Sequence, residues 1–77
     1  MKITEFLALD ETALEELQQS STVWFDCPVT LATFVVAFAQ PIEGVDDQAE
    51  IWTYDARDNE LFWGTFPVDM ALRVERD

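Results

Sequence analysis

The sequence predicts a small α+β domain, with an N-terminal helix packed on a three- to four-stranded antiparallel β-meander. Two observations lead to this fold class. Residues 10–20 have the apolar periodicity and end signals of a helix, and residues 49–66 have the alternation of a β-hairpin. The length of 77 residues allows one domain, residues 1–77, and no internal repeat or linker is present.

The N-terminal helix is predicted from its first turn and its apolar face. Asp10 can cap the helix, with Leu9 and Leu14 as a hydrophobic staple. Alternatively, Thr12 and Glu15 form a capping box. Either start gives a short amphipathic helix whose acidic side chains lie mostly near its positive N-terminal end.

The segments around this helix are less regular. Residues 3–7 could form a strand or a lead-in turn, whereas the β-branched and aromatic residues 22–25 favour a strand. Pro28 then removes one ladder hydrogen bond, and residues 29–39 are compatible with a strand or a helix. We favour a strand, with Phe34, Val36 and Phe38 on one face.

The second half of the chain carries the strongest β signal. Residues 40–47 are predicted to be a loop because they contain proline, glycine and paired aspartates. Residues 49–54 and 60–66 are then two strands joined by a turn at residues 55–59. In the first strand, Trp52 and Tyr54 are expected on one face, and Ile51 and Thr53 on the other. In the second strand, Phe62, Gly64 and Phe66 are expected on one face, and Leu61, Trp63 and Thr65 on the other.

The C-terminal segment leaves two alternatives. Residues 68–74 could be a last edge strand or a short helix started by Pro67 and Asp69, and residues 75–77 are expected to fray.

Composition restricts both the partners and the chemistry. Sixteen acidic and four basic side chains give a net charge of −12, and the chain contains no histidine. Anionic lipid and nucleic-acid phosphate would both repel this charge, so we expect a basic protein partner, no direct nucleic-acid binding and no membrane. The first residues lack a secretory pattern, and the apolar run at residues 29–39 is too short to cross a bilayer, which favours a cytoplasmic protein.

The sequence gives little reason to expect catalysis. Cys27 is the only cysteine, so it can form no internal disulfide; we expect it to be buried, with its pKa raised by neighbouring Asp26. The acidic residues lack the spacing of a calcium loop, and no phosphate-binding glycine motif is present. We therefore predict a protein that is not an enzyme and has no metal or cofactor.

The candidate site is an acidic and aromatic surface. Residues 43–60 carry seven acidic side chains against Arg57 alone, and residues 10–16 add four more. Carboxylates two residues apart on a strand are about 6.6 Å apart, which is similar to the phosphate spacing along one nucleic-acid strand. The predicted partner-binding residues are Glu43, Asp46, Asp47, Glu50, Asp55, Asp58 and Glu60, with Trp52, Tyr54 and Trp63 as apolar contacts.

A phosphate-like row is expected at Asp58 and Glu60, flanked by Asp55. The whole chain resembles the small acidic inhibitors of phages and mobile elements in its small size, its charge of −12, its acid-flanked hairpin at residues 49–66 and its lack of catalytic residues. These inhibitors are anti-CRISPR proteins and DNA mimics such as uracil-DNA glycosylase inhibitors. The resemblance implies an anti-CRISPR protein, in the cytoplasm of a bacterial host cell, that binds the basic DNA-binding surface of a CRISPR effector subunit and blocks target DNA recognition.

Two alternatives remain open. The acids could be the solvated surface of a halophilic-type small acidic domain, since acidic, lysine-poor proteins of this kind stay soluble in salt. The chain could also be an antitoxin or adaptor that binds a partner through Trp52, Tyr54 and Trp63. An apolar second face of the sheet would also allow a homodimer.

Overall fold

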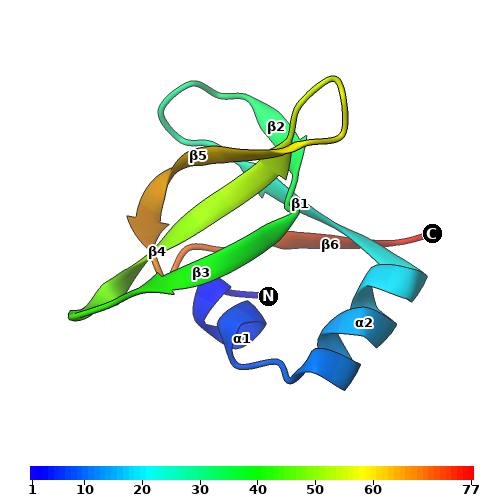
Figure 1. The fold of residues 1–77 in the computed structure, drawn as a ribbon, viewed down its shortest axis with the longest axis horizontal. Coiled ribbons are helices and arrows are strands. Elements are labelled where there is room, and N and C mark those ends of the chain that lie inside the picture. Colours follow the sequence, from blue (N-terminus) through cyan, green and yellow to red (C-terminus); the bar gives the residue numbers. More distant parts are fainter.

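The computed structural model describes residues 1–77 as two helices and six strands in two antiparallel sheets (Figure 1). The first sheet has the order β2-β1-β6 and contains β1 (Ser21–Asp26), β2 (Thr33–Val35) and β6 (Arg73–Arg76). The second has the order β3-β4-β5 and contains β3 (Phe38–Ile42), β4 (Val45–Tyr54) and β5 (Glu60–Pro67). The predicted α+β class is confirmed, and β3-β4-β5 is an antiparallel meander; the other sheet is an addition to the prediction.

The predicted helix at residues 10–20 is confirmed as α2 (Glu11–Ser20). Asp10 caps it, because its carboxylate accepts a hydrogen bond from the backbone N–H of Ala13 at 2.7 Å. Leu14 and Leu17 pack against the core, and α2 lies against β1.

The first segment is a helix, α1 (Ile3–Leu7), so both predicted alternatives, a strand and a turn, are wrong. The Glu5 carboxylate accepts a hydrogen bond from the Lys2 backbone N–H at 3.0 Å, which satisfies a free donor at the helix start. Ile3 and Phe6 fall on one side of α1 and are buried in the core.

The apolar segment at residues 29–39 does not form one strand. Val36 donates its backbone N–H to Val23 in the first sheet, and Ala37 donates its N–H to Trp52 in the second, both at 2.8 Å. The chain therefore passes between the sheets at this pair, and β2 and β3 are separate. Phe34 and Val36 face the core, but Phe38 lies on the outer face, stacked on Trp52, so the predicted common face is wrong for Phe38.

The predicted loop at residues 40–47 is largely strand. Pro41 is tolerated because β3 is an edge strand, where a missing N–H leaves no partner unsatisfied. Only Glu43 and Gly44 form the turn, between the paired residues Ile42 and Val45. Gly44 has φ +78°, a conformation that favours glycine.

The predicted hairpin is confirmed, with Tyr54 paired to Glu60 around a five-residue turn. After β5, the strand alternative for residues 68–74 is confirmed only for Arg73 and Val74, because β6 spans Arg73–Arg76 and residues 68–72 form a turn and an isolated bridge. The C-terminus is not frayed as predicted, because Ser21 pairs with Arg76 and the Asp77 N–H donates to the Ser20 carbonyl at 3.1 Å.

The core lies between the two sheets, and the helices cover one side of it (Figure 1). Phe25 from β1 is fully buried, with its ring centroid 4.6 Å from that of Phe66 in β5 and 5.5 Å from that of Phe34 in β2. Ile51 from β4 and Ile3 from α1 complete this centre. No helix in the structure has the length and apolar character needed to cross a bilayer.

Candidate functional site: an acidic face with an aromatic row

The outer face of the sheet β3-β4-β5 carries a row of three aromatic side chains. Trp52 lies opposite Phe38 on one neighbouring strand and opposite Phe62 on the other. The Trp52 and Phe38 rings are stacked, with centroids 5.2 Å apart and planes at 15°, and the Phe62 centroid lies 5.3 Å from Trp52. Such cross-strand aromatic pairs stabilise a sheet and leave a firm apolar surface.

Trp63 does not join this row, although it was predicted as an apolar contact with Trp52, and the predicted common face of Phe62, Gly64 and Phe66 is wrong because Phe66 lies in the core. Ile51 pairs with Gly64 and Trp52 pairs with Phe62, so Trp63 is the extra residue of a β-bulge. Its ring packs on Phe34, with centroids 4.5 Å apart, at the margin of the core. Phe62, and not Trp63, therefore lies beside Trp52.

Tyr54 lies at the far end of β4. It is 48% exposed and, with Gln18 and Val35, lines a pocket of about 260 Å³ beside the end of α2. Of the three predicted aromatic contacts, only Trp52 lies in the aromatic row.

Three of the predicted acids lie at the turn between β4 and β5, and we name Asp55, Asp58 and Glu60 the β4–β5 acid cluster. All three are exposed. Asp55 folds inward, because its carboxylate accepts hydrogen bonds from the backbone N–H of Asn59 at 2.9 Å and of Arg57 at 2.8 Å. These two bonds hold the pKa of Asp55 below its usual value, and the bond from Asn59 has the larger effect.

The predicted phosphate-like spacing does not hold for Asp58 and Glu60. Asp58 lies in the turn with φ +61°, and only Glu60 lies in the strand. The extended spacing of a strand therefore does not apply to this pair.

Three other acids lie at the opposite end of β4, and we name Glu43, Asp46 and Asp47 the β3–β4 acid cluster. Glu43 is in the two-residue turn, the two aspartates follow Val45 at the start of β4, and all three are exposed. The ten residues of β4 span about 30 Å at the usual rise per residue, so the two acid clusters lie about that far apart.

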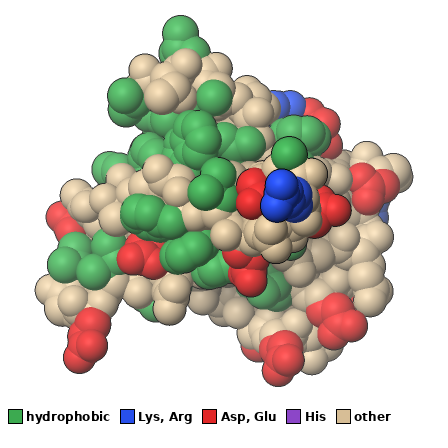
Figure 2. All heavy atoms as spheres, turned by 45° about the horizontal axis from the view of Figure 1, so that its top comes forward, with side chains coloured by type: hydrophobic (Ala, Val, Ile, Leu, Met, Phe, Trp, Pro, Cys, Tyr) green, Lys and Arg blue, Asp and Glu red, His purple; other side chains and the backbone are tan.

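Glu50 lies between the clusters, beside the aromatic row. It is half-buried, and its carboxylate accepts a hydrogen bond from the Trp52 indole N–H at 3.2 Å. This bond fixes an acidic group against the apolar surface. Figure 2 shows hydrophobic side chains gathered across the middle of the molecule, with acidic side chains on both sides of them.

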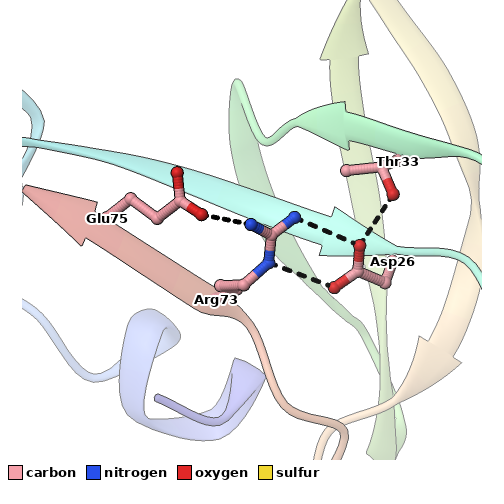
Figure 3. Close-up of polar contacts among 4 residues, drawn as sticks. All are labelled: Asp26, Thr33, Arg73 and Glu75. Carbon is pink, nitrogen blue, oxygen red and sulfur yellow. Dashed lines mark hydrogen bonds and ion pairs between the residues drawn. The ribbon is translucent and has the colours of Figure 1, made fainter.

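Almost none of this negative charge is paired. Of the sixteen carboxylates, only those of Asp26 and Glu75 form ion pairs, and both bind Arg73 (Figure 3). No group of three or more acidic or cysteine side chains has an arrangement that could hold a metal ion. The sheet β3-β4-β5 therefore carries an aromatic row beside carboxylates that form no ion pair.

Cys27 is buried, as predicted, but the predicted direction of its pKa is wrong. Hydrogen bonds from Thr30, first from its hydroxyl, and from the Trp63 indole lower the pKa of the thiol to about 7. Asp26 does not oppose this effect, because its carboxylate is engaged by Thr33 and Arg73.

Several residues of this surface could not be found from the sequence. Phe62 was predicted to share a face with Phe66 because no local signal predicts the bulge, and Val29 and Leu31 were predicted to lie in a strand but precede β2 in an irregular segment. Comparison of the chain with protein-family models, curated proteins and solved structures gives no match.

Proposed function

We propose that this chain is a non-enzymatic inhibitor that occupies the basic nucleic-acid-binding surface of another protein. The target that we propose is a CRISPR effector subunit, so the protein would act as an anti-CRISPR that blocks recognition of target DNA. A protein that acts by blocking needs no catalytic group, only a surface that competes with DNA.

The spacing of the two acid clusters carries this proposal. They lie about 30 Å apart at the ends of one strand. On one face of a duplex, the phosphates of a given strand recur after one helical turn, about 34 Å. The clusters could thus engage basic side chains that normally bind phosphates one turn apart. This correspondence replaces the phosphate-like row that was expected at Asp58 and Glu60.

The aromatic row supplies the second element of such an interface. Charged contacts accelerate association and provide selectivity, but interface affinity usually depends on a few well-packed aromatic or arginine side chains. Trp52 and Phe62 lie between the acid clusters, and Phe62 is 46% exposed. They are positioned to contact the partner while the carboxylates pair with its cations.

Neutralisation of each cluster tests the proposal. The variants are Asp46→Asn with Asp47→Asn, and Asp58→Asn with Glu60→Gln; Asp55 is left unchanged because its carboxylate holds the turn. A matched control, Glu15→Gln with Glu16→Gln, removes the same charge from α2. Inhibition of DNA binding is measured with purified CRISPR effector complexes of different types.

We expect each cluster variant to weaken inhibition at least about tenfold, and the α2 control to weaken it much less. If no effector complex is inhibited, the proposed target is wrong. If inhibition is insensitive to both cluster variants but is lost with Trp52→Ala, an adaptor-like aromatic interface explains binding better. A halophilic-type domain would inhibit nothing, and its stability would keep rising through molar salt.

A further inference from the structure

An apolar groove lies beside the acidic face, between residues 27–32 and β5. Its volume is about 540 Å³, and most of its lining side chains are hydrophobic. Buried Cys27 and Phe66 form part of the lining, and Leu61, Phe62 and Trp63 form its β5 side. Phe62 also belongs to the aromatic row, so the groove is continuous with the proposed interface.

The segment on the other side of the groove presents apolar side chains to solvent. Val29 is 82% exposed and Leu31 is 85% exposed. Single exposed apolar residues are common on proteins, but here they stand beside a groove that is itself apolar. Val29, 44% exposed Leu61 and 46% exposed Phe62 all line the groove and leave an apolar surface uncovered, and Leu31 lies two residues from Val29 in the same segment.

Backbone hydrogen bonds hold this segment in place. The Cys27 N–H donates to the Ala32 carbonyl at 2.8 Å, and the Leu31 N–H donates back to Cys27 at 2.9 Å. Leu31 has φ +61°, in the left-handed region that a residue with a side chain rarely adopts. The segment thus closes on itself and directs its apolar side chains outward, so little ordering is needed when they bind.

We propose that this groove binds an apolar side chain, flanked by lysine or arginine residues, of the basic protein that the acidic face contacts. The inference rests on the proposed function. Charge identifies the occupant: Glu60 adjoins the groove at Leu61, and the chain carries −12 overall. A second copy would bring the same charge against it, whereas a segment with basic flanks gains attraction while its apolar side chain is buried.

The test uses three short amidated peptides. The first has leucine between two pairs of arginines, the second has serine in place of the leucine, and the third, uncharged, has leucine with serine in place of each arginine. Each is titrated into the isotope-labelled full chain, and binding is followed by backbone amide chemical shifts at physiological salt. We expect the leucine peptide to bind at least about fivefold more tightly than the serine peptide and to shift the amides of Thr30, Phe62 and Trp63.

Two variants assign this preference to the groove. Val29→Ser with Leu31→Ser should reduce the affinity for the leucine peptide to that for the serine peptide, without unfolding the chain, because both side chains are exposed. Val45→Ser, an exposed valine at the start of β4, is the control and should change neither affinity.

The outcomes separate this inference from the proposed function. Equal, salt-sensitive binding of the leucine and serine peptides would overturn the groove site and leave the acidic surface supported. Equal binding of the leucine peptide and the uncharged leucine peptide would show an apolar site without charge selection, which overturns the basic occupant. A dimer in sedimentation that Leu31→Ser dissociates would assign the groove to a second copy and also overturn the inference.

Discussion

Arg73 in β6 binds Asp26 in β1 through two hydrogen bonds, from Nε at 3.4 Å and from Nη2 at 3.3 Å (Figure 3). The same guanidinium binds Glu75 and lies over the Trp24 ring, 5.9 Å from its centroid. Arg73 is the only basic side chain that forms ion pairs, and it does so in the sheet β2-β1-β6. No carboxylate of the other sheet therefore forms an ion pair, although those of Glu50 and Asp55 accept hydrogen bonds.

Replacement of Asp26 tests this contact through the pH dependence of stability. The Thr33 hydroxyl, at 2.7 Å, and then Arg73 hold the pKa of Asp26 below its ordinary value of 3.8. Because this pKa is lower in the folded state, the ionised carboxylate stabilises the fold above about pH 4, and this stabilisation is lost as the pH falls further. Asp26→Asn should lower the melting temperature slightly at pH 7 and make no difference in strong acid. A wild-type-to-variant difference that stays constant in acid would contradict this assignment.

Titration of Cys27 tests the environment of the thiol. With its pKa lowered to about 7, the thiolate should form in the native protein well below the ordinary value of 9.0, and its ionisation should add stability as the pH rises between these values. Thr30→Val removes the largest cause and should raise the midpoint of thiolate absorbance. Identical midpoints in the two proteins would show that Thr30 does not act on the thiol.

Phe25 and Phe62 should respond very differently to truncation. Phe25 is fully buried between Phe34 and Phe66, so Phe25→Ala should cost about 3 to 5 kcal/mol of the free energy of unfolding. Phe62 is 46% exposed, and Phe62→Ala should cost about 1 kcal/mol or less. Urea denaturation measures both values; similar losses would place Phe62 in the core.

The stability of the turn between β3 and β4 should depend on the backbone conformation of Gly44 and not on the space around it. Its φ is +78°, and no atom lies within 4 Å of the position that a Cβ would take. Gly44→Ala should therefore destabilise the fold by about 1 kcal/mol through conformational strain, and Gly44→Asn by less. Thermal unfolding would contradict this account if asparagine were as unfavourable as alanine.

Elements with local signals were predictable from the sequence. The Asp10 cap marks the start of α2, and the spacing of two aromatic runs predicts the β4–β5 hairpin. Elements that depend on distant contacts were not. The passage between sheets at Val36 and Ala37 requires partners on β1 and β4, and β6 pairs with a strand about fifty residues earlier.

The candidate site was predictable in composition but not in arrangement. Exposed acids on a chain of charge −12 follow from sequence, whereas the bulge that puts Phe62 and Phe66 on opposite faces of β5 does not. The inward carboxylate of Asp55 could have been recognised, because an aspartate at the start of a turn often binds the backbone two residues later.

Competition with DNA tests the central claim most directly. A purified CRISPR effector complex is loaded with this protein, and binding of its target duplex is measured at physiological salt and at about 0.5 M salt. The proposed function predicts mutually exclusive binding, with excess duplex displacing the protein, and a loss of affinity for the protein at high salt. A ternary complex of effector, duplex and this protein would contradict it.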